Sequence, residues 1–264
     1  MTRSSLQVPF FRPAISDAAI AEVADTLRSG WLTTGPKTAR FEAAFAEAVG
    51  ARHAVALSSA TAGLHLGTVA LGLRPGQAVL VPSMTFAATA EVVRYAGAVP
   101  ILYDCDPHTF QGDLTDAERK LDALRSGRRS GVRSGLRSDP EGGEAASAAD
   151  TLPAEIDADL EPVGIMPGHV GGRMLDLDAL AAFSKRHGLW TVEDAAHAFP
   201  AAWRADPDSP WRRAGEGTAE VTCFSFYANK TITTGEGGMA VTDEPERAEL
   251  LRSLSRHGLS RDAW

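Results

Sequence analysis

The chain has 264 residues, of which 44% are hydrophobic and 23% are charged, and its formal net charge is −8. This length allows one large α/β domain or two smaller ones, and it permits an enzyme. The negative charge excludes the basic field that nucleic-acid or anionic-membrane binding needs, so small molecules are the expected partners.

The two cysteines and the N-terminus indicate a protein of the reducing cytoplasm. Cys105 and Cys223 lie in separate apolar stretches, which excludes a disulfide framework or a cysteine-based zinc site and predicts buried free thiols. The first residues, MTRSSLQVPFFRPA, contain no apolar core long enough for a signal peptide. No run approaches the ~20 apolar residues of a membrane span. We therefore expect a cytoplasmic location without membrane contact.

Helices and apolar strands alternate through the first half of the chain. Apolar residues at helical spacing after Ser16, a suitable N-cap, predict a helix over Ile15 to Ser29 that ends near Gly30. The sequence FEAAFAEAV, from Phe41 to Val49, repeats this helical pattern. The following segments read as strand, helix, strand, helix and strand over residues 53–59, 60–73, 77–83, 86–97 and 99–106.

The segment from Arg119 to Leu160 interrupts this alternation. The tripeptide RSG recurs in it, aromatic and β-branched residues are almost absent, and a basic first half precedes an acidic second half. Too little apolar surface is available to offset the ordering of the chain, so a disordered surface insertion over residues 119–160 is predicted. The basic half would also suit an acidic partner, but a solvated loop without catalytic duty is the simpler interpretation.

The alternation resumes after this segment and defines the fold class. Strand, helix, strand, strand and helix are expected over residues 163–170, 176–188, 189–195, 221–227 and 245–258. Apolar strands separated by helices predict an α/β fold with a mostly parallel sheet covered on both faces, because parallel strands need crossover helices. We expect one domain over residues 1–264, with ligands beyond the carboxyl ends of the strands.

Polar and aromatic groups follow several of the expected strands. The sequence SSAT, from Ser58 to Thr61, opens a helix, so its N–H groups and hydroxyls would suit a phosphate. Lys230 follows the strand FSF and precedes the glycine-rich run GEGG. Besides SSAT, the candidate site residues at strand ends are Phe86, Asp194, His197, Ser225 and Lys230.

A phosphate cradle, an aromatic ring, an acid and a lysine at one sheet edge are the parts of a pyridoxal phosphate (PLP) site. The lysine forms a Schiff base, the acid pairs with the ring nitrogen, and the aromatic side chain stacks on the ring. Burial would lower the pKa of the Lys230 amine toward the neutral form that attacks an aldehyde.

Taken singly, each of these residues has an ordinary interpretation. The lysine suits a solvated surface, the serines and the acid suit helix caps or loops, and the phenylalanine and histidine suit a core. Agreement among separate strand ends is what favours a functional site. No set at metal-ligand spacing and no GxGxxG after a strand is present, so the sequence favours neither a metal site nor a Rossmann dehydrogenase.

Several segments together resemble the DegT/DnrJ/EryC1/StrS family of PLP-dependent sugar-nucleotide aminotransferases, which have fold type I. They include SSATAGLH, VPSMTFAATA, MPGHVGG, VEDAAHA and FSFYANKTITTGEGGM. The resemblance spans nearly the whole chain apart from the insertion and is strongest to the branch that aminates C4 of a UDP-linked 4-keto pentose. It implies a homodimer and a C-terminal small domain that is absent from this chain, which stops at Trp264.

The resemblance implies a role for each site residue. Lys230 would hold the cofactor covalently, Asp194 would bind its ring nitrogen, and His197 would lie beside its phenolic oxygen. Stacking on the ring and binding of the phosphate would fall to Phe86, Ala60, Thr61 and Ser225.

The implied reaction moves an amino group from an amino acid, usually L-glutamate, to a keto sugar nucleotide. The products of such reactions serve cell-surface polysaccharide, lipopolysaccharide or antibiotic sugar synthesis. Two alternatives remain. One is a related PLP-dependent sugar dehydratase, which has a histidine where Lys230 stands, so the lysine argues against it. The other is a non-catalytic relative that binds the cofactor or a sugar nucleotide, which an incomplete catalytic unit would favour.

Overall fold

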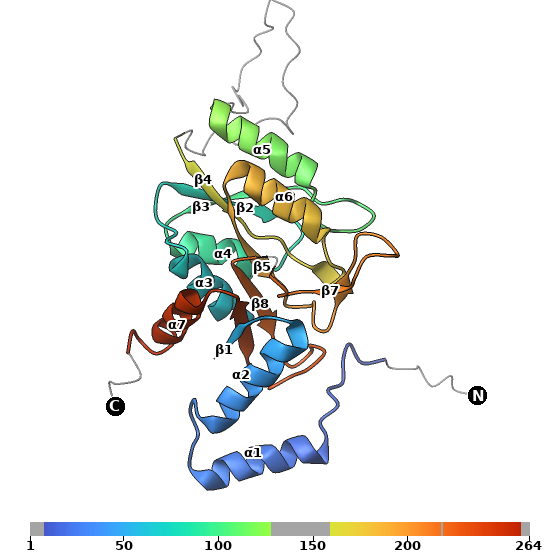
Figure 1. The fold of residues 1–264 in the computed structure, drawn as a ribbon, viewed down its shortest axis with the longest axis vertical. Coiled ribbons are helices and arrows are strands. Elements are labelled where there is room, and N and C mark those ends of the chain that lie inside the picture. The colour runs from blue at the N-terminus through green and yellow to red at the C-terminus, as the bar shows by residue number, and fades with distance from the viewer. Residues whose placement is uncertain (1–7, 128–158, 218, 260–264) are drawn as a thin grey trace, which may run out of the picture.

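The computed structural model describes residues 8–127, 159–217 and 219–259. Its main strands are β1 (His53–Leu57), β2 (Gln77–Pro82), β3 (Val99–Tyr103), β4 (Glu161–Ile165), β5 (Trp190–Asp194), β8 (Val221–Ser225) and β9 (Gly238–Thr242). They form one seven-stranded sheet in the order β1-β9-β8-β5-β4-β2-β3. Strand β9 is antiparallel to both neighbours, and the other neighbouring pairs are parallel. The mostly parallel sheet predicted from the sequence is confirmed (Figure 1).

Helices cover both faces of this sheet. The covering helices are α2 (Pro36–Val49), α3 (Ala60–Ala70), α4 (Ala87–Tyr95), α5 (Leu114–Ser126), α6 (Leu177–His187) and α7 (Pro245–Leu254), and α1 (Asp17–Ser29) precedes them in the chain. Side chains of α3, α4 and α7 pack on one face, and those of α2, α5 and α6 pack on the other. Among the described residues, no helix combines the length and the apolar character needed to cross a membrane.

Strand β2 shows how alternate residues of one strand pack on opposite faces of the sheet. Its burial is continuous, as expected for a strand that is covered on both sides. Val79 and Val81 join the core beneath α3 and α4, while Ala78 and Leu80 join the core beneath α5 and α6. A separate small sheet pairs β6 (Ala202–Trp203) with β7 (Arg212–Arg213).

Helix boundaries follow local capping chemistry. Ser16 caps α1 as predicted, because its Oγ accepts the Ala19 N–H at 3.2 Å. Gly30 ends α1 with φ +75°, a conformation that favours glycine. Helix α2 begins at Pro36 rather than at Phe41. Proline is well suited to the first helical position, since its missing N–H has no intrahelical acceptor there.

The structure corrects the start of the insertion that the sequence predicted from Arg119. Residues 119–126 form the second half of α5, and Asp113 caps this helix by accepting the Thr115 N–H. Leu121 and Leu124 are 0% and 2% exposed and belong to the core beneath α5 and α6. Their spacing on one helix face gives this segment the apolar contact that its charged composition hides. Gly127 ends α5, Leu160 packs against the same core just before β4, and residues 128–158 of the expected insertion lie outside the described residues.

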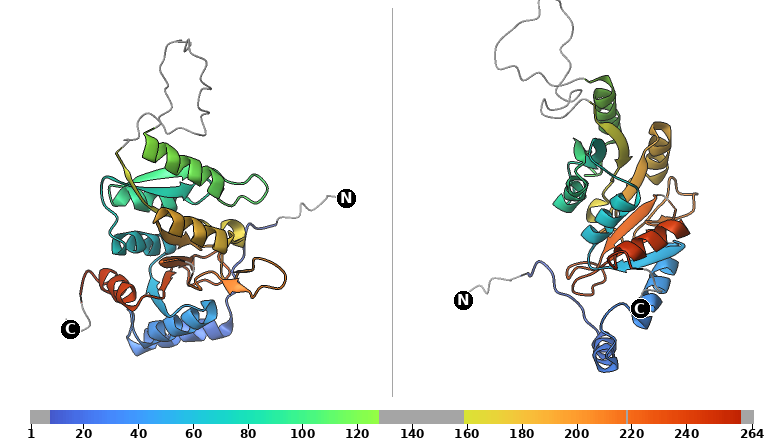
Figure 2. Two further views of the ribbon diagram at one scale, coloured as in Figure 1. Left: turned by 45° about the horizontal axis from the view of Figure 1, so that its top comes forward. Right: turned by 90° about the vertical axis from the view of Figure 1, so that its left-hand side faces the viewer.

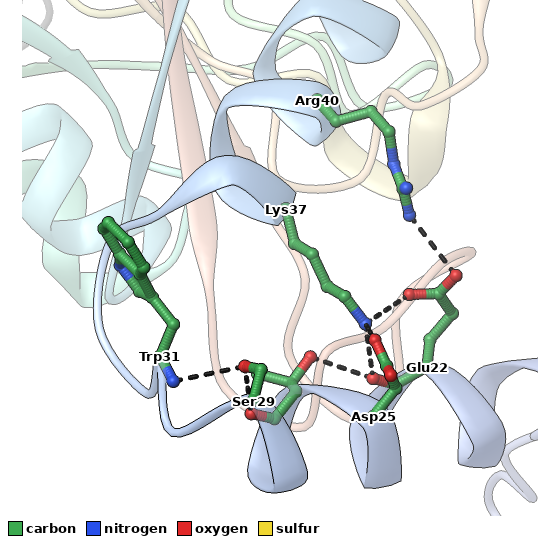
Figure 3. Close-up of polar contacts among 7 residues, drawn as sticks. Glu22, Asp25, Ser29, Trp31, Lys37 and Arg40 are labelled. Carbon is green, nitrogen blue, oxygen red and sulfur yellow. Dashed lines mark hydrogen bonds and ion pairs between the residues drawn. The ribbon is translucent and has the colours of Figure 1, made fainter.

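Helix α1 lies beyond α2 and away from the sheet (Figures 1 and 2), and it has no buried residue. Its link to α2 is ionic (Figure 3): Lys37 Nζ lies 2.6 Å from Glu22 Oε2 and 2.7 Å from Asp25 Oδ2. Arg40 also contacts Glu22, at 3.3 Å. The hydrogen bond from Lys37 lowers the pKa of both carboxyl groups. Helix α1 is therefore held against α2 by ion pairs between solvent-accessible side chains.

Replacing Leu121 tests the packing of α5. Leu121→Ala is expected to lower the free energy of unfolding by about 2–5 kcal/mol, because it leaves a cavity in a close-packed core. Leu102→Ala is the matched control, since Leu102 is 54% exposed on β3. Urea denaturation followed by circular dichroism measures both variants. Equal and small losses would show that residues 119–126 do not pack as α5.

Replacing Lys37 tests the attachment of α1. Lys37→Gln should speed amide hydrogen exchange in α1, because Lys37 pairs with two carboxylates, whereas Arg40→Gln removes one contact and should act less. Salt at about 1 M, where the Debye length is ~3 Å, should speed exchange more in the wild type than in Lys37→Gln, in which the Arg40–Glu22 pair remains. Exchange in α1 that neither substitution nor salt alters would contradict an ionic attachment.

Candidate functional site

One cavity at the carboxyl ends of the parallel strands gathers the residues singled out from the sequence. Its volume is about 690 Å³, which lies in the usual range for small-molecule sites. The segments that build it follow β1, β2, β4, β5 and β8. Its lining includes every predicted site residue, namely Ala60, Thr61, Phe86, Asp194, His197, Ser225 and Lys230.

The N-terminus of α3 forms one end of the cavity. Ser59 caps the helix, and its Oγ accepts the Ala62 N–H at 3.0 Å. The first N–H groups of a helix have no intrahelical acceptor and carry partial positive charge, which suits an anion. Strand β9 passes so close that a Cβ on Gly238 would lie 2.2 Å from the Ser59 carbonyl carbon. Glycine at this position therefore allows the helix start and the sheet to form a common cradle.

Asp194 is fixed at the end of β5 and is only 8% exposed. Its backbone N–H donates to Pro167 O at 2.8 Å, and its carbonyl accepts the His169 N–H at 3.1 Å. Its carboxylate is held as well, because Oδ2 accepts the Thr89 hydroxyl at 2.7 Å and Oδ1 accepts the Ala196 N–H at 3.2 Å. The acid thus lines the cavity in a fixed orientation.

Lys230 and His197 are nitrogen bases on the same cavity wall. Burial lowers the pKa of Lys230, an effect that the charge of Asp194 opposes. Burial and the positive charge of Lys230 lower the pKa of His197, which the charge of Asp194 raises in part. The His197 Nδ1 accepts the Gly171 N–H at 3.3 Å, so the proton of the neutral ring belongs on Nε2. Both side chains are biased toward their neutral forms.

Exposed aromatic and apolar side chains supply the rest of the cavity wall. Phe86 precedes α4 and is 76% exposed, which leaves its ring free to stack on a planar ligand. Met84 and Tyr227 line the same cavity and are also exposed. Neither was predicted from the sequence, because an apolar side chain after a strand is more often part of a core. Thr89 was not predicted either, since its bond to Asp194 joins residues far apart in the chain.

A second groove, of about 710 Å³, lies at the opposite ends of the strands. Its polar groups bond to one another: Arg247 Nη1 donates to Glu220 O at 3.0 Å and to Thr242 Oγ1 at 3.1 Å. The Glu220 carboxylate accepts the Thr191 N–H at 2.6 Å. These groups stabilise the sheet edge, and none of the residues predicted from the sequence lines this groove.

Known proteins resemble this chain in both sequence and structure. Residues 13–127 and 148–264 match the DegT/DnrJ/EryC1/StrS aminotransferase family. The chain is 37% identical over 259 residues to the spore coat polysaccharide biosynthesis protein SpsC of Bacillus subtilis (strain 168), covering 97% of this chain and 55% of that relative.

Solved structures give the same result. A Streptococcus pneumoniae protein named as a sugar aminotransferase, in its PLP form, has a TM-score of 0.75 and 29% identity, covering 97% of this chain and 59% of that one. DesI, solved with its TDP-sugar product, has a TM-score of 0.70 and 31% identity, covering 94% of this chain and 52% of that one.

The chain therefore spans little more than half the length of these relatives. Within that span the fold is the large domain of a fold-type I aminotransferase, as the resemblance implied. The family match covers most of the sequence, including every segment that contributes to the cavity. The chain belongs to the DegT/DnrJ/EryC1/StrS aminotransferase family.

Proposed function

We propose that this protein binds PLP and transfers an amino group from an amino acid to a keto sugar nucleotide. The observation that carries the proposal is that Lys230, Asp194 and the N-terminus of α3 meet in one cavity. The names of the relatives, which refer to polysaccharide synthesis, sugar aminotransfer and a TDP-sugar, support a sugar substrate. We propose L-glutamate as the donor, a homodimer as the active unit, and a UDP-linked 4-keto pentose as the first acceptor to test.

The residues present fit the cofactor in charge and shape. The capped N-terminus of α3 and the hydroxyl of Ser225 suit the phosphate. The exposed ring of Phe86 suits the flat face of the pyridine. A carboxylate at the deep end of the cavity, Asp194, suits a protonated ring nitrogen, since an ion pair of this kind stabilises both charges.

Lys230 has the properties of a residue that binds an aldehyde and then moves a proton. When bound, PLP supplies a ring that withdraws electrons from the substrate carbon next to the nitrogen. The lowered pKa of Lys230 increases the neutral fraction of its amine, which is the nucleophilic and proton-accepting form. The same neutral amine of Lys230 would serve as the base that moves a proton at the donor carbon.

Asp194 and His197 would each hold a proton at the cofactor. The carboxylate of Asp194 would accept a hydrogen bond from the ring N–H, and a fixed charge of this kind preorganises a site for catalysis. The Nε2–H of neutral His197 would be available to donate to the ring oxygen. The Gly171 N–H holds this tautomer by occupying Nδ1.

Lys230→Ala tests the covalent role. The wild type, incubated with PLP and reduced with borohydride, should gain the mass of the cofactor on the peptide that contains Lys230, whereas Lys230→Ala should gain none and lose all amino transfer. Lys185→Ala, on α6, is the control and should behave as the wild type. Modification that persists in Lys230→Ala would refute the assignment.

Substrate class is tested with the wild type and L-glutamate. Mass spectrometry should detect an aminated product from one of a panel of UDP-, GDP- and dTDP-linked keto sugars. Cofactor bound at Lys230 without turnover of any sugar would instead support a non-catalytic, cofactor-binding protein.

The pKa of Lys230 predicts a second outcome in the cofactor-free protein. An acylating reagent reacts only with the neutral amine. The lowered pKa should therefore shift the pH midpoint of Lys230 acylation below the ordinary lysine value of 10.5. Asp194→Asn removes the charge that raises this pKa, and the midpoint should fall further. Peptide mass spectrometry across a pH series measures both midpoints. A wild-type midpoint at or above the ordinary value, or one that Asp194→Asn raises, would contradict the electrostatics described above.

A further inference from the structure

We propose that Thr89 is a positioning residue for Asp194 and that Thr85 aligns it, an inference that rests on the proposed function. Thr89 lies in the first turn of α4 and is 0% exposed. Its Oγ1 is 2.7 Å from Asp194 Oδ2 and 2.8 Å from Thr85 Oγ1. The two hydroxyls and the carboxylate form a continuous hydrogen-bonded relay, in which Thr85 and Asp194 line the cavity and Thr89 is buried between them.

The chemistry of the groups fixes the direction of this relay. An ionised carboxylate only accepts hydrogen bonds, so the Thr89 hydroxyl donates to Asp194. The Thr89 oxygen is then free to accept, and Thr85 donates to it. Hydrogen bonds in such a chain polarise one another and strengthen the final bond to the charged group.

The relay restrains a side chain that has few other restraints. The terminal torsion of aspartate is broad and roughly two-fold, so rotation of the carboxylate is otherwise easy. Thr89 holds Oδ2, and the Ala196 N–H holds Oδ1 at 3.2 Å. These two bonds fix the carboxylate plane of Asp194, which lines the cavity, so its remaining lone pairs are held in one orientation for a ring N–H.

Glycine at position 168 leaves room for the Thr85 hydroxyl. The chain after β4 passes Thr85 at Gly168, where a Cβ would lie 3.3 Å from Thr85 Oγ1. This distance is tighter than a relaxed contact, so a larger residue at 168 would push on the first hydroxyl of the relay.

Paired substitutions at Thr89 separate the hydroxyl from the methyl group. Thr89→Val keeps the shape and removes the hydroxyl, and it should weaken PLP binding about tenfold or more, the usual loss for a hydrogen bond to a charged group. Thr89→Ser keeps the hydroxyl and should bind within about threefold of the wild type. A packing role predicts the opposite order, because valine fills the space and serine does not.

Absorbance and visible circular dichroism titrations with PLP measure affinity and ring environment together. Thr68→Val is the matched control: Thr68 is also 0% exposed, but its hydroxyl bonds to His65 O at 2.8 Å, away from Asp194. It should leave both signals unchanged. If Thr89→Val does not fold, Thr85→Val is tested in its place. This variant should bind PLP more weakly than the wild type and show an altered visible circular dichroism.

The possible outcomes separate failure of the Thr89 role from failure of the proposed function. A wild type that binds no PLP would overturn both. A wild type that binds PLP, together with a folded Thr89→Val that binds equally well, would overturn the role of Thr89 alone. If Thr89→Val does not fold, a Thr85→Val variant with the PLP affinity and visible circular dichroism of the wild type would also overturn the role of Thr89.

Discussion

The site depends on backbone hydrogen bonds that continue past the end of β5. This strand lies between β4 and β8 and is parallel to both. The Asp194 N–H donates to Pro167 O, and the next N–H, of Ala195, donates to Cys223 O at 2.9 Å. The backbone of Asp194 therefore cannot move without breaking the pairing of a central strand. Rigid placement of this kind is what electrostatic stabilisation of a reacting group requires.

Around this fixed acid, burial and charge act on Lys230 in opposite directions. The carboxylate favours the ammonium form, whereas burial favours the neutral amine, and burial has the larger effect. A lysine beside an aspartate in water would form an ordinary ion pair. In the cavity, the carboxylate is already engaged by Thr89 and Ala196. The arrangement thus favours the neutral amine of Lys230 in a cavity that also holds a fixed carboxylate, which is the combination that the proposed chemistry needs.

The sequence predicted the parts of the structure that local pattern determines. Parallel strands were predicted because their apolar runs alternate with helices, and the candidate site because polar groups follow those runs. Strand β9 was missed: it begins at the last glycine of GEGG, and no strand was expected between residue 227 and the helix from residue 245. It completes an antiparallel hairpin with β8, which needs no crossover helix. The second half of α5 was hidden by charged residues around Leu121 and Leu124, and Thr89 by a contact that no local pattern encodes.

A crystal structure of the protein with PLP tests the central claim most directly. The account predicts continuous density between Lys230 Nζ and the cofactor, the ring nitrogen within hydrogen-bonding distance of the Asp194 carboxylate, and the phosphate at the N-terminus of α3. Cofactor bound elsewhere, such as in the groove beside Arg247, or a ring nitrogen turned away from Asp194, would contradict it.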